Sequence, residues 1–311
     1  MTLSRRDLLK IGASASAALA LGVRPGLGRG SRDPLALIVR PIPSTGEEIP
    51  VVGIGTARRY DVGTSAAERD PLRETVALFR DLGGKLIDTA PSYGNAETVV
   101  GDLVAELGFR DQLFLATKVR KEGLDEGLAE IERSFGLLKT DTFDLLQVHN
   151  LVDVDTQLAT LRELKESGRV RYIGMTTSSA RQYEQFADVM RSEDMDFIQV
   201  NYSLASREAA TEILPLARDR GMAVLINLPF GRGRLFSAVG DRLLPDWTAE
   251  FDCESWGQFF LKYILGNAAV TCVIPGTAKP HYATDNMGAA MGRLPDAATR
   301  TRMEELFDGL A

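Results

Sequence analysis

The sequence predicts one (β/α)8 TIM barrel, a closed cylinder of eight parallel strands surrounded by helices. Short apolar runs alternate eight times with longer stretches in which apolar residues recur at helical spacing. Such alternation implies parallel strands joined by right-handed crossovers. The chain has 311 residues, which accommodates a barrel of about 250 residues with short additions. Polar side chains end several apolar runs, as is typical of the rim where a barrel places its active site.

The expected elements follow the chain in order. A β-hairpin comes first, with apolar residues 37–39 and Ile49 on either side of a turn at residues 44–46. The eight barrel strands are expected at residues 51–54, 85–88, 113–119, 143–149, 170–175, 197–200, 222–226 and 270–274. Their helices are expected at residues 71–82, 96–107, 124–138, 158–165, 180–190, 209–218, 255–265 and 282–291, and a terminal helix begins near residue 296.

A doubly wound open sheet is the alternative fold with the same alternation of elements. It would normally carry a glycine-rich fingerprint between its first strand and first helix. The run Gly53-Ile54-Gly55 lacks the third glycine before a helix. The barrel is therefore favoured.

Residues 1–32 are predicted to be a signal and linker, and residues 33–311 to form the barrel domain. The segment Ser4-Arg5-Arg6-Asp7-Leu8-Leu9-Lys10 resembles a twin-arginine (Tat) export signal. The apolar run that follows, residues 11–23, is too short to span a bilayer comfortably. The resemblance implies export by the Tat machinery to the periplasm, with a membrane tether if the signal stays uncleaved. A disordered basic tail or a short helix is the alternative.

Composition excludes several classes of function. The net charge is −7 at pH 7, and no basic face is evident, which argues against a nucleic-acid partner. The chain has 2 cysteines and 2 histidines without metal-binding spacing. Neither a disulfide framework nor a metal site is expected.

Four polar residues at or just beyond expected strand ends suggest a site that handles protons. Asp88 ends the strand in the run KLIDTAPSYG, and Tyr93 lies on the loop beyond it. Lys118 and His149 close the next two strands. A buried carboxylate needs a cation or hydrogen-bond donors. Each residue alone also fits a structural role, but their joint placement at one rim favours a site.

These four side chains suit the reduction of a carbonyl group. A phenol has a pKa near 10, and a neighbouring ammonium favours the phenolate, which makes the phenol a better proton donor. A carboxylate holds the ammonium, and an imidazole orients the carbonyl oxygen. Since none of these groups supplies a hydride, a nicotinamide cofactor is implied.

Five motifs resemble those of the aldo-keto reductase family: DTAPSYG, ATKV, QVHN, IGMTTSS and VIPGTAKPHYATDN. The resemblance as a whole extends from about residue 51 to the end of the last barrel helix. The resemblance implies that Tyr93 is the general acid/base and that Asp88, Lys118 and His149 complete a catalytic tetrad.

The resemblance also implies binding of NADP(H) rather than NAD(H). The residues expected at the cofactor are Thr56, Thr176, Thr177, Gln199, Leu228, Pro229, Phe230, Gly231, Gly233, Thr277, Lys279, Asp285 and Asn286. Two positions depart from the family: Asn227 replaces an aromatic stacking residue, and Tyr282 replaces an arginine that holds the 2′-phosphate. Lys279 and Arg234 are the candidate charge partners in its place.

Two other functions remain open from the sequence. Lys118 on a barrel strand would also suit a Schiff-base aldolase. The departures at Asn227 and Tyr282 would also suit a redox-silent barrel that binds a nicotinamide or another ligand. Arg58 and Arg59 either are solvated or receive an anionic substrate. The rings of Trp247, Phe251 and Trp256 either line the pocket or pack on the outer ring of the barrel.

Overall fold

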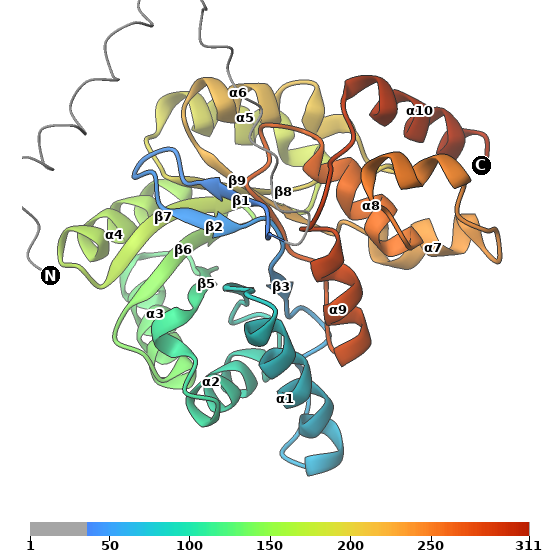
Figure 1. The fold of residues 1–311 in the computed structure, drawn as a ribbon. Helices are drawn as coiled ribbons and strands as arrows, with labels where there is room; N and C mark the ends of the chain where they lie inside the picture. Colours follow the sequence, from blue (N-terminus) through green and yellow to red (C-terminus); the bar gives the residue numbers. More distant parts are fainter. Residues whose placement is uncertain (1–35, 311) are drawn as a thin grey trace, which may run out of the picture. The chain divides into compact units, whose positions relative to one another are not determined.

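The computed structural model describes residues 36–310 and contains one curved sheet of eight parallel strands (Figure 1). Each strand pairs with its neighbours in the chain, so the strand order is the sequence order. The strands are β3 (Ile54–Gly55), β4 (Leu86–Asp88), β5 (Phe114–Val119), β6 (Phe143–His149), β7 (Val170–Thr176), β8 (Phe197–Asn201), β9 (Ala223–Asn227) and β10 (Cys272–Val273).

The sheet closes on itself between its first and last strands. Parallel bridges join Val52 to Val273 and Gly55 to Gly276. The Gly53 N–H donates to the Val273 carbonyl at 2.9 Å, and the Gly55 N–H donates to the Pro275 carbonyl at 3.0 Å. The (β/α)8 barrel is therefore confirmed, and the open doubly wound sheet is wrong.

Helices cover the outside of the barrel (Figure 1). They are α1 (Ala66–Asp81), α2 (Ala96–Glu106), α3 (Leu124–Leu138), α4 (Val154–Glu166), α5 (Tyr183–Ser192), α6 (Ile213–Asp219), α7 (Arg234–Val239), α8 (Trp256–Leu265), α9 (Pro280–Gly288) and α10 (Ala297–Asp308). Short 3-10 helices are η1 (Arg110–Gln112), η2 (Ala180–Gln182), η3 (Glu208–Ala210), η4 (Gly231–Gly233) and η5 (Asp246–Phe251). Within residues 36–310, none of the helices has the length and apolar character needed to cross a membrane.

Helix α1 begins earlier than its apolar spacing predicts. The expected start at residue 71 placed Pro71 at the first helical position, where a missing N–H costs nothing. The structure adds residues before it, because polar contacts hold the extra turn. The Ser65 hydroxyl donates to Glu68 at 2.6 Å, and Arg69 forms an ion pair with Asp102 at 2.5 Å.

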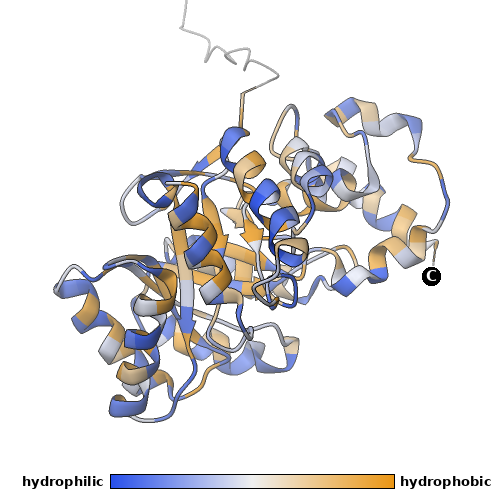
Figure 2. Cartoon of the chain, turned by 90° about the horizontal axis from the view of Figure 1, so that it is seen from below, coloured by the Kyte–Doolittle hydropathy of each residue, from blue (hydrophilic) through white to orange (hydrophobic). Residues whose placement is uncertain are grey.

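Alternating side chains divide the core into two layers. In β5, Phe114 and Ala116 face the barrel interior, whereas Leu115 and Val119 face the helices. By the same alternation Lys118 faces inward. Figure 2 shows the hydrophobic residues gathered on the strands and on the helix faces against them.

The predicted hairpin, β1 (Val39–Pro41) and β2 (Glu48–Pro50), is confirmed and lies across one end of the barrel (Figure 1). Ile42 and Ile49 pack into the interior cluster with Leu86 and Phe114. The hairpin therefore plugs the end at which the barrel strands begin.

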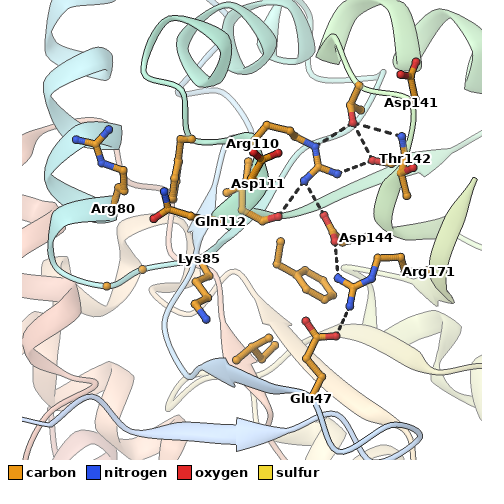
Figure 3. Close-up of a pocket in the computed structure, with 17 residues that line it drawn as sticks. Glu47, Arg80, Lys85, Arg110, Asp111, Gln112, Asp141, Thr142, Asp144 and Arg171 are labelled. Atoms are coloured by element: carbon orange, nitrogen blue, oxygen red, sulfur yellow. Dashed lines mark hydrogen bonds and ion pairs between the residues drawn. The ribbon is translucent and has the colours of Figure 1, made fainter.

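A cavity of about 760 Å3 lies at this amino-terminal end (Figure 3). It is lined by residues that precede β4, β5 and β6, such as Lys85, Leu113 and Thr142. Asp144, which is 4% exposed, connects its walls. The Asp144 carboxylate accepts a hydrogen bond from the Leu115 N–H at 2.8 Å and pairs with Arg110 at 3.1 Å and Arg171 at 2.6 Å.

The Asp144 pairs continue to the hairpin, because Arg171 also forms an ion pair with Glu47. Figure 3 shows this chain of charges from the Arg110 loop to the plug. The cavity is at the opposite end of the barrel from the four candidate catalytic residues, and its ion pairs connect the Arg110 loop, β6, β7 and the hairpin.

Replacing Asp144 by alanine should lower the free energy of unfolding by about 2 kcal/mol, because it leaves the buried Leu115 N–H without its acceptor and removes the partner that Arg110 and Arg171 share. Urea denaturation measures this change. Asp188→Ala is the matched control: its side chain is 72% exposed and, within residues 36–310, pairs only with Arg191, so the change should stay within about 0.5 kcal/mol. Equal effects of the two substitutions would contradict the structural role of Asp144.

Candidate active site

The ends of β4 and β5 meet around a buried ion pair. The Lys118 ammonium donates to both Asp88 carboxylate oxygens, at 2.7 and 2.8 Å, and to the Thr89 carbonyl at 2.7 Å. The Lys118 side chain is fully buried and the Asp88 side chain is 4% exposed. The register places Asp88 beside Ala116 and Lys118 beside Gln147, so both groups project toward the carboxyl-terminal mouth.

Tyr93 and His149 stand beside this ion pair. The Lys118 ammonium is 5.1 Å from the centroid of the Tyr93 ring. The rings of Tyr93 and His149 are 6.1 Å apart and nearly perpendicular, at 87°. The structure thus brings together all four residues predicted for catalysis.

The loop that carries Tyr93 is held by a glycine with a left-handed backbone. Gly94 has φ +63°, and a Cβ there would lie 2.2 Å from an Asp61 carboxylate oxygen. That same oxygen accepts the Asn95 N–H at 2.9 Å. Only glycine permits this approach, which fixes the turn directly after Tyr93.

Two glutamines orient the Asp88 carboxylate. Gln199 Nε2 donates to Asp88 at 3.0 Å and Gln147 Nε2 donates at 3.4 Å. Gln199 is held in turn by the Thr176 hydroxyl, which donates to its Oε1 at 2.7 Å. Gln147 is not among the residues predicted from the sequence. Its position two residues before His149 on the same strand face could have revealed it.

Burial determines the protonation state of Tyr93. Desolvation raises the pKa of the Tyr93 hydroxyl, and the Asp88 charge adds to the increase, whereas the charge and hydrogen bond of Lys118 lower it. The net pKa is raised, so the expectation of a pKa lowered by Lys118 describes only one of two opposing effects. The free enzyme keeps this phenol protonated and ready to donate.

Lys118 remains an ammonium. Burial lowers its pKa, but the charges of Asp88 and Tyr93 and their hydrogen bonds outweigh burial, and the net pKa is raised. The ammonium donates two hydrogen bonds to Asp88 and one to Thr89, and it also lies close to the Tyr93 ring. This state is suited to stabilising a phenolate and is unsuited to nucleophilic attack.

His149 is neutral at physiological pH. Burial, with smaller effects of Lys118 and Arg120, lowers its pKa to about 3. Its Nδ1 atom is buried and has no hydrogen-bond partner in the part of the chain that the structure describes. A neutral imidazole donates one N–H, so His149 can polarise a carbonyl oxygen without delivering a proton to it.

The predicted cofactor residues near the mouth also have structural partners. Thr56 is buried and its hydroxyl donates to the Asp88 carbonyl at 3.0 Å. The Thr177 hydroxyl donates to Gln182 at 2.5 Å, and the Thr177 carbonyl accepts from Asn227 at 3.1 Å. Of these residues, Gln199 contacts the Asp88 carboxylate, Thr176 holds Gln199, and Thr56 bonds the Asp88 backbone, whereas Thr177 bonds Gln182 and Asn227.

Three buried acceptors near the ends of β8 and β9 suit a dinucleotide. Asn201 Oδ1, Ser203 Oγ and Asn227 Oδ1 have no partner within residues 36–310. The hydroxyl and amide donors of a nicotinamide nucleotide would satisfy such acceptors. The adjacent loop bends sharply, with positive φ at Leu228, Gly231 and Gly233, and contains Pro229 and Phe230.

The segment after β10 supplies the remaining predicted residues. The Thr277 hydroxyl donates to the Pro275 carbonyl and accepts from Asn286 at 2.9 Å. Lys279 is exposed immediately before α9. Asp285 points toward α8, where it accepts from Ser255 at 2.7 Å and Gln258 at 3.2 Å.

The structure also places the residues whose roles the sequence left open. Arg58 and Arg59 are exposed, and Arg59 lies against Gly276 at the end of β10. The rings of Trp247, Phe251 and Trp256 pack around Phe259 in α8. They therefore belong to the outer ring. Among the described residues no cluster of metal-ligating side chains is found, and Cys253 and Cys272 are free and buried.

Comparisons with known proteins agree with this geometry. The sequence pattern of the aldo/keto reductase family matches residues 51–304. The chain is 33% identical over 226 residues to the aldo-keto reductase YhdN of Bacillus subtilis (strain 168), covering 68% of this chain and 66% of that protein. It is 26% identical to an NADH-specific methylglyoxal reductase of Escherichia coli (strain K12), covering 87% of this chain and 98% of that protein.

Solved structures share the fold. An aldo/keto reductase from Klebsiella pneumoniae in complex with NADP and acetate has a TM-score of 0.69 at 22% identity, covering 84% of this chain and 93% of that one. The aldo-keto reductase AKR2E5 complexed with NADPH has a TM-score of 0.70 at 19% identity, covering 87% and 88%.

A barrel whose mouth joins a phenol to a buried ammonium–carboxylate pair and a neutral imidazole defines an oxidoreductase of the carbonyl-reducing class. The chain belongs to the aldo/keto reductase family. It is accordingly an NAD(P)H-dependent enzyme.

His149 should make the protein sensitive to acid. The unfolded chain takes up a proton at this histidine below the ordinary pKa of 6.5, whereas the folded protein does so only at about 3. Stability is therefore lost as pH falls from 6.5 toward 3, by roughly 2 kcal/mol at pH 5. Urea unfolding at pH 7 and pH 5 should show a smaller loss in His149→Gln than in the native protein.

His281→Gln is the matched control for this measurement. His281 is exposed, so folding does not remove it from water. Its variant should lose as much stability between pH 7 and pH 5 as the native protein. An equal loss in His149→Gln would contradict a buried neutral His149.

Proposed function

We propose that this enzyme reduces an aldehyde or ketone to an alcohol with NADPH, or runs the reverse reaction, with Tyr93 as general acid/base. The main support for this proposal is the position of the Lys118 ammonium, which lies 5.1 Å from the Tyr93 ring centroid and pairs with Asp88 at 2.7 Å. A phenol that must lose its proton is thus placed against a fixed positive charge. A merely structural ion pair would not require a phenol at that position.

Each side chain has a distinct part in the proposed reaction. When bound, the nicotinamide supplies the hydride that adds to the carbonyl carbon. Tyr93 gives its proton to the carbonyl oxygen, and the Lys118 ammonium stabilises the phenolate that remains. Asp88 holds the ammonium, and the neutral His149 donates an N–H to the oxygen. In the reverse direction the phenolate takes the proton from the alcohol.

The preference for NADP(H) is part of this proposal. The Klebsiella pneumoniae structure contains NADP and the AKR2E5 structure contains NADPH, whereas the Escherichia coli relative is NADH-specific by name. In this chain, Thr277 and Lys279 precede the amino end of α9, where backbone N–H groups favour a phosphate. Exposed Lys279 is the candidate partner for the 2′-phosphate.

The contacts of Lys118 count against a Schiff-base aldolase. A lysine nucleophile must be a free amine, but the Lys118 ammonium is fully buried, has a raised pKa, and is bound by Asp88 and Thr89. The carbonyl reductase proposal needs the charged form that these contacts favour.

Replacing Tyr93 by phenylalanine should lower kcat by about 10²–10⁴-fold, because the proton donor is lost. NADPH should still bind, as measured by fluorescence titration with NADPH and NADH. Tyr172→Phe removes a hydroxyl at the opposite end of the barrel, where it bonds Thr45 and Glu47, and should keep its activity. Full turnover by Tyr93→Phe on a panel of aldehydes would exclude Tyr93 as the acid.

Export by the twin-arginine translocation (Tat) machinery to the periplasm is also proposed, from the sequence alone. The segment that carries Arg5 and Arg6 and the apolar residues 11–23 lie outside the described residues. Replacing both Arg5 and Arg6 by lysine should leave the protein in the cytoplasmic fraction, whereas Arg24→Lys should not. Unchanged periplasmic recovery of the double variant would refute the export route.

A further inference from the structure

Arg120 is positioned at the mouth of the barrel beside the candidate catalytic residues. It is the first residue after β5, whose register pairs Lys118 with Gln147 and Val119 with Val148. One step further along both strands, Arg120 lies level with His149. Alternation places Arg120 on the same side as Lys118, and His149 on the same side as Gln147. The effect of the Arg120 charge on the pKa of His149 agrees with this closeness.

The Arg120 guanidinium has no hydrogen bond or ion pair within residues 36–310, and the residue is exposed. Only its backbone is engaged: the Arg120 N–H donates to Glu130 Oε2 at 2.6 Å. Arg110 shows the contrasting case, because its guanidinium bonds Thr140, Leu113 and Thr142. A free arginine beside the mouth is therefore available to a ligand.

The backbone beneath Arg120 is held in place. Gln157 Nε2 donates to the carbonyls of Lys121 and Gly123, both at 3.0 Å. The Gly123 N–H donates to Asp153 at 2.7 Å. These bonds connect the loop after β5 to α4 and to Asp153 in the loop that follows His149. A fixed backbone with an unpaired cation reduces the entropy cost of binding an anion.

We propose that Arg120 binds a carboxylate of the substrate, so that the preferred substrates are aldehydes or ketones that carry a carboxylate several bonds from the carbonyl. The planar guanidinium can bind a carboxylate through two parallel hydrogen bonds. In this arrangement the carbonyl oxygen lies at Tyr93 and His149, and the carboxylate lies against the Arg120 guanidinium. The inference rests on the proposed carbonyl reduction and narrows it to a substrate class.

The test compares 4-carboxybenzaldehyde with the uncharged 4-formylbenzamide. The native enzyme should prefer the acid, and Arg120→Gln should lower kcat/KM for the acid about tenfold, mainly through KM. The amide should change by less than about twofold. Arg120→Lys should keep most of the preference. Arg218→Gln is the matched control, because it removes the same charge from an exposed site on α6.

A binding measurement tests carboxylate binding by Arg120 separately from carbonyl reduction. Calorimetry with 4-(hydroxymethyl)benzoate and its amide, with and without NADPH, should show weaker binding of the acid alone in Arg120→Gln. If both aldehydes are reduced and Arg120→Gln changes neither the preference nor the binding, the Arg120 inference is wrong while carbonyl reduction stands. If neither aldehyde is reduced, carbonyl reduction of this class fails, and the calorimetric comparison still decides whether Arg120 binds the carboxylate.

Discussion

The buried ammonium of Lys118 constrains the whole mouth of the barrel. A lysine without solvent contact loses its charge unless its surroundings replace water. Here the two Asp88 oxygens and the Thr89 carbonyl do so. Asp88 must in turn be oriented, and Gln199 donates to it from β8, across the barrel. One desolvated charge thereby connects strands that are far apart in the chain.

This constraint gives the neighbouring groups three different protonation states. Lys118 is charged, Tyr93 is protonated and His149 is neutral, and each state follows from its contacts. A carbonyl group needs this combination: one group to give a proton, one to stabilise the resulting anion, and one to polarise the oxygen without competing as an acid. The Asp88–Lys118 pair therefore contributes mainly by orienting the groups of the site. Its contribution to net stability is small, since buried ion pairs are costly to desolvate.

The two ends of the barrel have different tasks. At the amino-terminal end the hairpin plug and the Asp144 ion pairs connect several strands. At the carboxyl-terminal end, Arg58, Asn150, Leu151 and Leu228 adopt left-handed backbones although none is glycine. Such conformations cost about 1 kcal/mol or more each and cluster at functional sites.

The sequence by itself determined the order and type of the elements and the ends of the strands that carry Asp88, Lys118 and His149. These features depend on local periodicity, which a strand or helix imposes on its own residues. The start of α1 could not be predicted in this way, because a contact with Asp102 on another helix stabilises its first turn.

Tertiary structure alone decided the donors around Asp88, the packing of Trp247 and Trp256, and the direction of the Tyr93 pKa. These depend on which groups from distant strands surround a side chain and on how much water they exclude. Burial and Coulomb energies belong to that assembled environment, and neither can be read from the spacing of residues along the chain.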